Sequence, residues 1–410
     1  MMNLLIDFIT LQKKTGAGEY IRRIFHELIK YMEIEHININ IYALFDSSKP
    51  IAYNDMCQDA LSKTTFLDVS QTTIDKLIEE YSIDKFFIGC AQYIGIYSDV
   101  TNIRCKVICV VHDLAHEEKY VNKIGVFYKL LESNAEEKPT LSLKEKLNRK
   151  LFHPHTYYDK FSEWYVREAG NKYFSYALDH MENILRLYHN NPKFRFIAVS
   201  EYTKSTMAYN WDIPMERIDV LYSPERILLK KGTIDNPLLA DLIATNRKYY
   251  LLVSAHAIAK NATKAIHAFS KYYKITPDVY LVTIGYHTDN AFANHINIDF
   301  LSESDLANAY ENCYALIYPS FFEGFGYPPI EAMHYGKPVL CSNTTSMPFV
   351  LGDAPIYFSP LYESAIFNAL LTLTDENYKL YSHKSQLQYK LVHDRQESDL
   401  KKLIRLTVNE

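Results

Sequence analysis

The sequence predicts an α/β protein with two domains, each built on a parallel sheet. Short apolar runs of strand length alternate along the chain with stretches whose apolar residues recur at helical spacing. This alternation is typical of parallel strands joined by helical crossovers. The length of 410 residues is sufficient for two such domains. Apolar residues make up 48% of the chain and charged residues 23%, as expected for a globular protein with a large core.

Net charge, cysteine use and the N-terminal residues narrow the class of protein. A net charge of −5 gives no reason to expect nucleic-acid binding. The six cysteines form no C-x-x-C pair and mostly lie in apolar runs, so we expect buried free thiols in a reducing compartment. The first residues lack the features of a signal peptide, and no run of about 18 apolar residues occurs. We therefore expect a cytoplasmic protein.

The first part of the chain is predicted to hold repeated strand and helix units. Its strand-like runs lie at residues 4–11, 38–45, 65–69, 85–90 and 105–111, with a helix at 74–81. Another helix, with an apolar face over residues 21–32, is expected to follow a loop at residues 15–18. Gly16 and Gly18 lie in this loop. A tight strand-to-helix turn explains them, and the alternative is a loop whose amides meet a phosphate or a sugar.

The strand at residues 105–111 delivers two polar residues to its carboxyl end. His112 and Asp113 follow it directly. Ligands of open α/β sheets gather at the carboxyl ends of strands, so His112 is a candidate active-site residue. A structural histidine is the alternative. Asp113 is expected to orient the neighbouring segment.

The region from residue 121 to 193 has a helical pattern and many aromatic residues, but no motif. Its segment 138–161 carries six Lys or Arg against two acidic residues, with aromatic residues between them. Such a segment suits an anionic membrane surface or a charged acceptor, and the alternative is a solvated basic helix. Beyond it, Ser200 is a predicted N-cap for a helix from Glu201. The connection to the second domain is placed near residue 228.

The second domain is predicted to begin with a strand, a loop containing Lys260 and a helix. The expected strands are at residues 249–253, 279–285 and 296–301, and the expected helices start at residues 262 and 303. Lys260 is well placed to meet a diphosphate, and the alternative is a solvated loop lysine. Ser302 is the predicted N-cap of the second helix.

The stretch from residue 314 to 342 is predicted to be a strand, a loop, a short helix and a second strand. The loop carries Glu323 and the helix Glu331, with seven residues between the two. Glycines allow close backbone approach to a ligand, while prolines and a further glycine bound the helix: Gly324, Gly326, Pro328, Pro329, Gly336 and Pro338. Glu331 is expected near the helix N-terminus, where anions are favoured. Both carboxylates would then hold hydroxyls of one polar ligand, and the alternative is two solvated charges.

This stretch resembles a known family. The sequence EGFGYPPIEAMHYGKPVLCS is similar to the donor-site signature of retaining glycosyltransferases of the GT-B fold, family four (glycosyltransferases group 1). The segments TGAGEYIRRIF, VVHDL and SDLKKLIRL resemble other parts of the same family. The resemblance implies two Rossmann-like domains facing across a cleft, at residues 1–228 and 229–397. A C-terminal helix at residues 398–410 would cross back to the first domain.

The resemblance also implies a role for each candidate residue. Glu331 would bind the ribose hydroxyls of a nucleotide diphosphate sugar, Glu323 would hold hydroxyls of the donor sugar, and His112 would face that sugar. The other donor-side positions are the loop residues Gly324, Phe325 and Gly326, the base-holding turn at Leu301, and Lys260, Gly16 and Gly18 beside the diphosphate. In the loop that contains Lys260, two positions depart from the family pattern: Ser254 stands where glycine is expected and Ala259 where one branch has arginine. Either another basic residue supplies the missing charge, or the enzyme is slow, or its donor site is altered.

The predicted activity is transfer of a hexose from a UDP-, GDP- or other nucleotide sugar to a glycan or lipid-linked acceptor. The products would be bacterial surface polysaccharides such as lipopolysaccharide or capsule. The chain holds no D-x-D triplet, which argues against a metal-bridged diphosphate. The resemblance implies a retaining, metal-independent enzyme without cofactors. The enzyme would be peripheral on the cytoplasmic face of the inner membrane if segment 138–161 contacts that membrane. The alternatives are a non-catalytic GT-B partner subunit that binds a nucleotide or glycan, and a sugar-nucleotide epimerase.

Overall fold

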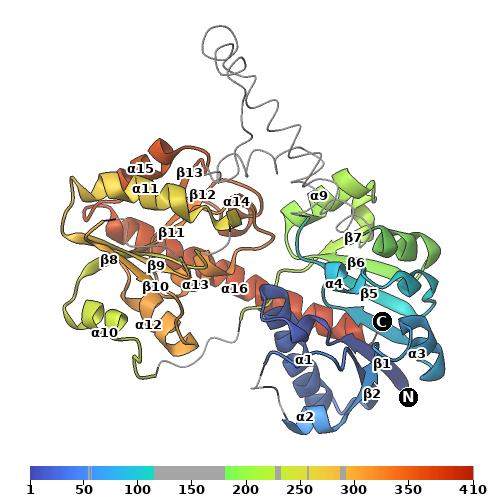
Figure 1. The fold of residues 1–410 in the computed structure, drawn as a ribbon. Helices are drawn as coiled ribbons and strands as arrows, with labels where there is room; N and C mark the ends of the chain where they lie inside the picture. Colours follow the sequence, from blue (N-terminus) through green and yellow to red (C-terminus); the bar gives the residue numbers. More distant parts are fainter. Residues whose placement is uncertain are drawn as a thin grey trace, which may run out of the picture.

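The computed structural model has two domains side by side, each built on one sheet, with a long helix running between them (Figure 1). It describes residues 1–114 except 54, 55 and 57, and residues 181–226, 232–255, 258–286 and 292–409. The basic segment 138–161 and most of the region 121–193 therefore lie outside the described residues.

The described part of the first domain contains seven parallel strands in the order β3-β2-β1-β4-β5-β6-β7. The strands are β1 (Met2–Asp7), β2 (Ile39–Phe45), β3 (Thr64–Asp68), β4 (Lys85–Ile88), β5 (Lys106–Val111), β6 (Phe194–Ala198) and β7 (Ile218–Val220). The helices are α1 (Gly16–Ile34), α2 (Gln58–Ser62), α3 (Ile74–Glu80), α4 (Ala91–Ile94) and α9 (Glu201–Trp211). The strand order reverses between β1 and β4, and such a switch point is where open α/β sheets bind ligands.

The second domain repeats this design with six parallel strands in the order β10-β9-β8-β11-β12-β13. The strands are β8 (Lys248–Leu252), β9 (Val279–Ile284), β10 (His295–Ile298), β11 (Ala315–Tyr318), β12 (Val339–Ser342) and β13 (Ile356–Phe358). The helices are α10 (Pro237–Ala244), α11 (Ala262–Tyr273), α12 (Glu303–Asn312), α13 (Tyr327–His334), α14 (Met347–Leu351) and α15 (Glu363–Thr372). Here the order reverses between β8 and β11.

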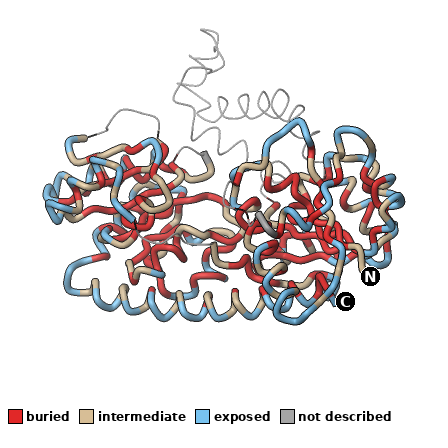
Figure 2. The backbone as a smooth tube through the Cα atoms, turned by 90° about the horizontal axis from the view of Figure 1, so that it is seen from below, coloured by how far each residue is buried: buried red, intermediate tan, exposed pale blue. Residues whose placement is uncertain are grey.

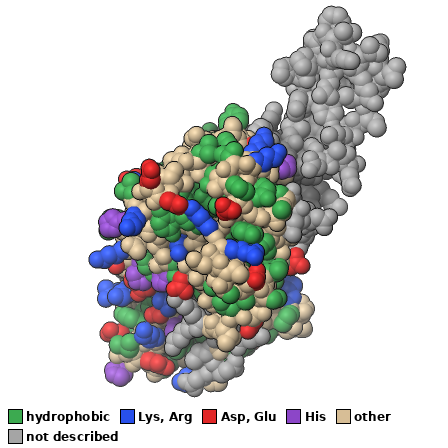
Figure 3. Space-filling view, turned by 90° about the vertical axis from the view of Figure 1, so that its left-hand side faces the viewer, with side chains coloured by type: hydrophobic (Ala, Val, Ile, Leu, Met, Phe, Trp, Pro, Cys, Tyr) green, Lys and Arg blue, Asp and Glu red, His purple; other side chains and the backbone are tan. Residues whose placement is uncertain are grey.

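The cores lie on both faces of the two sheets. Every residue of β11 and β12 is buried, as is β5 after its first residue, so these apolar runs are covered on both faces as predicted. Figure 2 shows the buried residues concentrated in the two sheets, with exposed residues on the outer turns. Figure 3 shows the end of the molecule formed by the second domain, where acidic and basic side chains are interspersed.

Local signals predicted most elements to within a few residues. Both predicted N-caps are confirmed: Ser200 Oγ accepts a hydrogen bond from Thr203 N, and Ser302 Oγ accepts one from Asp305 N. The predicted loop at residues 15–18 is wrong, because α1 already begins at Gly16.

Two further details concern the ends of β1 and the cysteines. The first strand ends at Asp7 rather than residue 11, and a 3₁₀ turn, η1 (Thr10–Gln12), follows it. The described cysteines are free, as expected, and all but Cys105 are buried.

The C-terminal helix is longer than predicted. Helix α16 (Tyr378–Val408) has 31 residues and begins far before residue 398. Its first part is bonded to the second domain, where Gln388 Nε2 donates to Val350 O at 2.8 Å. Its end lies on the first domain, where Lys85 Nζ donates to Leu406 O at 2.7 Å. The helix thus crosses between the domains. Among the residues that the structure describes, no helix is long and apolar enough to cross a membrane.

Candidate functional site

The candidate site lies at the switch point of the second sheet. Lys260 ends η4 (Ile258–Lys260), the turn that follows β8, and Glu323 lies in the loop after β11. Phe321 N donates to Ala259 O at 2.7 Å, which ties the two segments together. The buried Asn261 amide donates to Pro319 O at 3.1 Å and so fixes Lys260 against the end of β11. The fold thus places a lysine and a carboxylate where ligands of such sheets bind.

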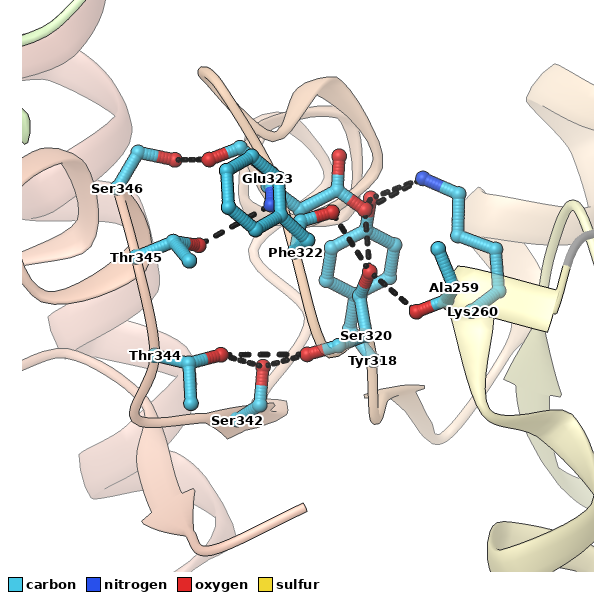
Figure 4. A network of polar contacts seen from close by, with 10 residues as sticks. All are labelled: Ala259, Lys260, Tyr318, Ser320, Phe322, Glu323, Ser342, Thr344, Thr345 and Ser346. Carbon is cyan, nitrogen blue, oxygen red and sulfur yellow. Dashed lines mark hydrogen bonds and ion pairs between the residues drawn. The ribbon is translucent and has the colours of Figure 1, made fainter. Parts of the chain in front are cut away.

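Three donors converge on one oxygen of Glu323 (Figure 4). Glu323 Oε1 accepts hydrogen bonds from Lys260 Nζ at 2.5 Å, Tyr318 Oη at 2.6 Å and Ser320 Oγ at 2.6 Å. Burial and the nearby carboxylate raise the pKa of Tyr318 well above its ordinary value, so its hydroxyl stays a donor. Figure 4 shows the other carboxylate oxygen pointing away from these donors. The site therefore holds a charge-assisted pair with one carboxylate oxygen outside the network.

Hydroxyl residues at the end of β12 and directly after it hold the backbone of this loop. Glu323 N donates to Thr345 Oγ1 at 3.1 Å, and Ser346 Oγ donates to Glu323 O at 2.9 Å. Ser342 Oγ donates to Ser320 O at 2.6 Å. These supporting residues were not predicted from the sequence. The signal that marks them is the run SNTTS, residues 342–346, which begins at the last residue of a buried strand.

Glu331 has a different environment from the one predicted. Helix α13 begins at Tyr327, so Glu331 lies in its second turn, beyond the free amides of the first turn, and the expectation that it sits near the helix N-terminus is wrong. Its Oε1 accepts a hydrogen bond from Arg226 Nη1 at 2.9 Å. Burial and the neighbouring Glu331 carboxylate raise the pKa of the Tyr310 hydroxyl. The other oxygen of Glu331, Oε2, makes no hydrogen bond with any described residue. Arg226 is the site residue that sequence reasoning missed.

His112 lies at the carboxyl end of β5, as predicted. Its Nε2 is 2.9 Å from Gly89 O, and burial lowers the pKa of His112 below its ordinary value. Because a carbonyl only accepts, Nε2 carries the proton and Nδ1 of the neutral ring is an acceptor. The ring of Tyr20 packs edge-on at 4.9 Å. The backbone carbonyl of Asp113 accepts from Gln92 at 2.7 Å.

Gly324 brings the two domains together. A Cβ atom at Gly324 would lie 1.9 Å from His112 O, and Ser200 Oγ donates to Gly324 O at 2.8 Å. The lack of a side chain at Gly324 therefore admits the backbone of the other domain, and the predicted approach to a ligand stays a prediction. The same contact brings His112 and the Glu323 loop, which were predicted separately, to one junction.

The remaining donor-side predictions fall on packed positions. Phe325 is 5% exposed and packs edge-on against Tyr222 at 5.2 Å, and Leu301 is 6% exposed in the core. In the structure both residues belong to the hydrophobic core, and the ligand contact predicted for them stays a prediction.

The glycines of the predicted loops also have packing roles. A Cβ at Gly18 would lie 2.5 Å from Lys13 O, whereas one at Gly16 would make only an ordinary contact with the Tyr327 ring. Gly326 is the N-cap of α13, with φ +90°. Ser254 has φ +57°, a conformation that favours glycine, which explains physically why the resemblance predicts glycine there.

Known proteins resemble this chain over different lengths. Residues 240–360 match the family described as glycosyl transferases group 1. The chain is 32% identical over 191 residues to the O-antigen chain mannosyltransferase RfbU of Salmonella typhimurium, covering 42% of this chain and 50% of that protein. It is 41% identical over 83 residues to O-antigen chain mannosyltransferase B of Escherichia coli, covering 20% of this chain and 22% of that protein. The chain thus spans at most half the length of these relatives.

Solved structures share the whole architecture at low identity. Sucrose-phosphate synthase from Thermosynechococcus elongatus matches with a TM-score of 0.64 at 13% identity, covering 99% of this chain and 98% of that one. WaaG, a glycosyltransferase involved in lipopolysaccharide biosynthesis, matches with a TM-score of 0.57 at 12% identity and full coverage of both chains. These matches show the two-domain GT-B fold that the sequence predicts.

Proposed function

We propose that this chain, which has the GT-B fold and carries a glycosyl transferases group 1 segment at residues 240–360, is a glycosyltransferase of surface polysaccharide synthesis. It would move a hexose from a nucleotide diphosphate sugar to a glycan or lipid-linked acceptor. One observation carries the proposal: Lys260 and Glu323 meet at the switch point of the second sheet, inside the matched segment.

In this proposal the Glu323 network binds the two halves of the donor. The oxygen outside the network accepts hydrogen bonds from sugar hydroxyls, while Lys260 pairs with the diphosphate. The bond between the anomeric carbon and the diphosphate oxygen breaks, and its electron pair leaves with the diphosphate. A cation fixed beside the leaving oxygen stabilises the negative charge that develops there. Catalysis is then mainly positioning and leaving-group stabilisation.

The proposed reaction retains the anomeric configuration and needs no metal. The acceptor hydroxyl attacks from the face that the diphosphate leaves, and the departing phosphate takes its proton. Neutral His112, with Nδ1 as acceptor, would bind a hydroxyl of the donor sugar from the first domain. The basic segment 138–161 would contact an anionic membrane surface at the cytoplasmic face, where a lipid-linked acceptor is reached.

The names of the similar proteins suggest which donors to test first. RfbU and the E. coli relative are named mannosyltransferases, so mannose is the first hexose. A structural neighbour, HepE of Anabaena, is described in complex with UDP and glucose, at a TM-score of 0.61 and 12% identity over 99% of both chains. UDP- and GDP-linked mannose and glucose form the starting panel.

The test is release of nucleotide diphosphate from this panel, with and without a lipid-linked glycan fraction as acceptor. We expect Glu323→Gln to lower kcat/KM at least a hundredfold while the protein stays folded, because Gln keeps an acceptor but loses the charge that holds Lys260. Asp353→Asn, which changes an exposed carboxylate paired with Lys384, is the matched control and should leave activity unchanged. Nucleotide binding without turnover in the wild type would instead support a non-catalytic partner subunit.

A further inference from the structure

Arg226 covers Glu331, the carboxylate that the resemblance predicts to face the donor. The Glu331 side chain is 7% exposed, whereas that of Arg226 is 31% exposed. Glu331 Oε1 is taken by Arg226 Nη1, and Oε2 is buried without a hydrogen bond among the described residues. A ligand that approaches this position therefore meets a guanidinium, with the carboxylate behind it.

Hydrogen bonds from helices α13 and α16 hold the three residues before Arg226. Tyr327 Oη donates to Pro224 O at 3.2 Å, and Tyr389 Oη donates to Glu225 Oε1 at 2.7 Å. Gln396 Nε2 donates to Ser223 O at 2.7 Å. Arg226 is thus a fixed part of the donor-side domain, although it precedes that domain in the sequence.

The surroundings of Arg226 favour an anion. The guanidinium lies 5.9 Å from the Tyr327 ring, the same ring that neighbours Gly16 in the first turn of α1. The N-terminus of this 19-residue helix therefore lies close by, and its free amides and dipole favour negative charge. The one acidic residue of that first turn, Glu19, is already paired with Arg22 at 2.8 Å.

We propose that Arg226 is a donor-binding residue whose guanidinium contacts the diphosphate of the nucleotide sugar, with Glu331 as the residue that orients it. This inference rests on the proposed function. In this proposal Arg226 supplies the positive charge that an arginine at position 259 would supply in one branch of the family. Lys260 and Arg226 then supply two cations to one leaving group. A planar guanidinium suits phosphate oxygens because it donates two parallel hydrogen bonds.

The experiment compares each nucleoside diphosphate with the nucleoside that lacks the diphosphate group. Isothermal titration measures the Kd of UDP and GDP, and of uridine and guanosine, for the wild type, Arg226→Gln and Arg226→Lys. We expect Arg226→Gln to weaken binding of the preferred diphosphate by about ten- to a hundredfold, because a charge-assisted contact is lost. The matching nucleoside should change by less than about twofold. Arg226→Lys should recover part of the loss. Arg186→Gln, in an exposed pair with Glu182, is the matched control.

The variant Arg226→Gln, Glu331→Gln guards against loss of folding, because it removes both charges and leaves no lone buried carboxylate. It should show the same selective loss for the diphosphate. Equal weakening of nucleoside and diphosphate would overturn the proposal, since Arg226 would then act only on the nucleoside side. Unchanged binding in Arg226→Gln would also overturn it. If the wild type binds none of the nucleotides, the proposed function itself fails.

Discussion

Glu323 and Glu331 belong to one motif, yet the structure gives them opposite environments. Glu323 gathers a lysine and two hydroxyls on one oxygen and directs the other oxygen away from them. Glu331 is covered by Arg226 and buries its second oxygen without a partner among the described residues. Two of the donors around Glu323 are hydroxyls, as a sugar also offers, so sugar hydroxyls can donate to the oxygen outside the network while Lys260 faces a diphosphate. Arg226, the partner of Glu331, follows three residues that hydrogen bonds hold in place, so it stays with Glu331.

The difference teaches that the spacing of two carboxylates does not say which one faces a ligand. The burial of each carboxylate and the side chains that bind it decide which one faces a ligand. Glu331 is 7% exposed behind a guanidinium that is 31% exposed, and its second oxygen is buried, so this pair presents the cation. Glu323, in the loop after the central strand β11, keeps one oxygen outside its hydrogen-bond network, so it presents its own oxygen.

The largest expected effect comes from removing Arg226, the cation of the Glu331 pair, and not from removing Glu331 itself. Arg226→Met should lower the free energy of unfolding by about 4 kcal/mol, because it leaves a buried carboxylate without a counter-charge. Glu331→Gln should cost only about 1 kcal/mol, because the partly exposed guanidinium can turn toward water and the amide oxygen still accepts. Urea unfolding of both variants measures the asymmetry. Equal losses would mean that the two side chains are equally desolvated, against the comparison drawn above.

A third carboxylate shows what happens without a cation. Asp7, buried at the end of β1, accepts hydrogen bonds from Thr10 and Gly89, all neutral donors, and burial raises its pKa to about 6. Because this folded pKa exceeds the unfolded value, the stabilising contribution is complete below about pH 4 and is lost as the pH rises through 6. The wild type should lose up to about 3 kcal/mol relative to Asp7→Asn between pH 4 and pH 7. A pH-independent difference in urea unfolding would contradict this.

Local signals in the sequence predicted the frame of the site well. The apolar run of β5 correctly placed His112 at a carboxyl end, and the strand–loop order placed Lys260 and Glu323 at theirs. Helix caps such as Ser200 follow from a single side chain and the next three amides, so they too were predicted.

Long-range pairings could not be predicted in the same way. Lys260 and Glu323 are 63 residues apart and Arg226 and Glu331 are 105 apart, so no local pattern links them. The first half of α16 was missed because it exposes leucines, among them Leu380 and Leu387, which blurs the helical period.

The smallest expected effect concerns the departure from the family pattern at Ser254. This residue has φ +57°, so Ser254→Gly should raise the free energy of unfolding by up to about 1 kcal/mol through relief of backbone strain. Asn261 is the matched control, with φ +56° in the same loop, but its amide donates to Pro319 O and Pro360 O. Asn261→Gly should therefore destabilise the protein, since two buried carbonyls lose their donor. If both variants gain stability in thermal unfolding, the amide contacts contribute little. The position of Lys260 beside Glu323 would then depend on the backbone bond between Phe321 and Ala259.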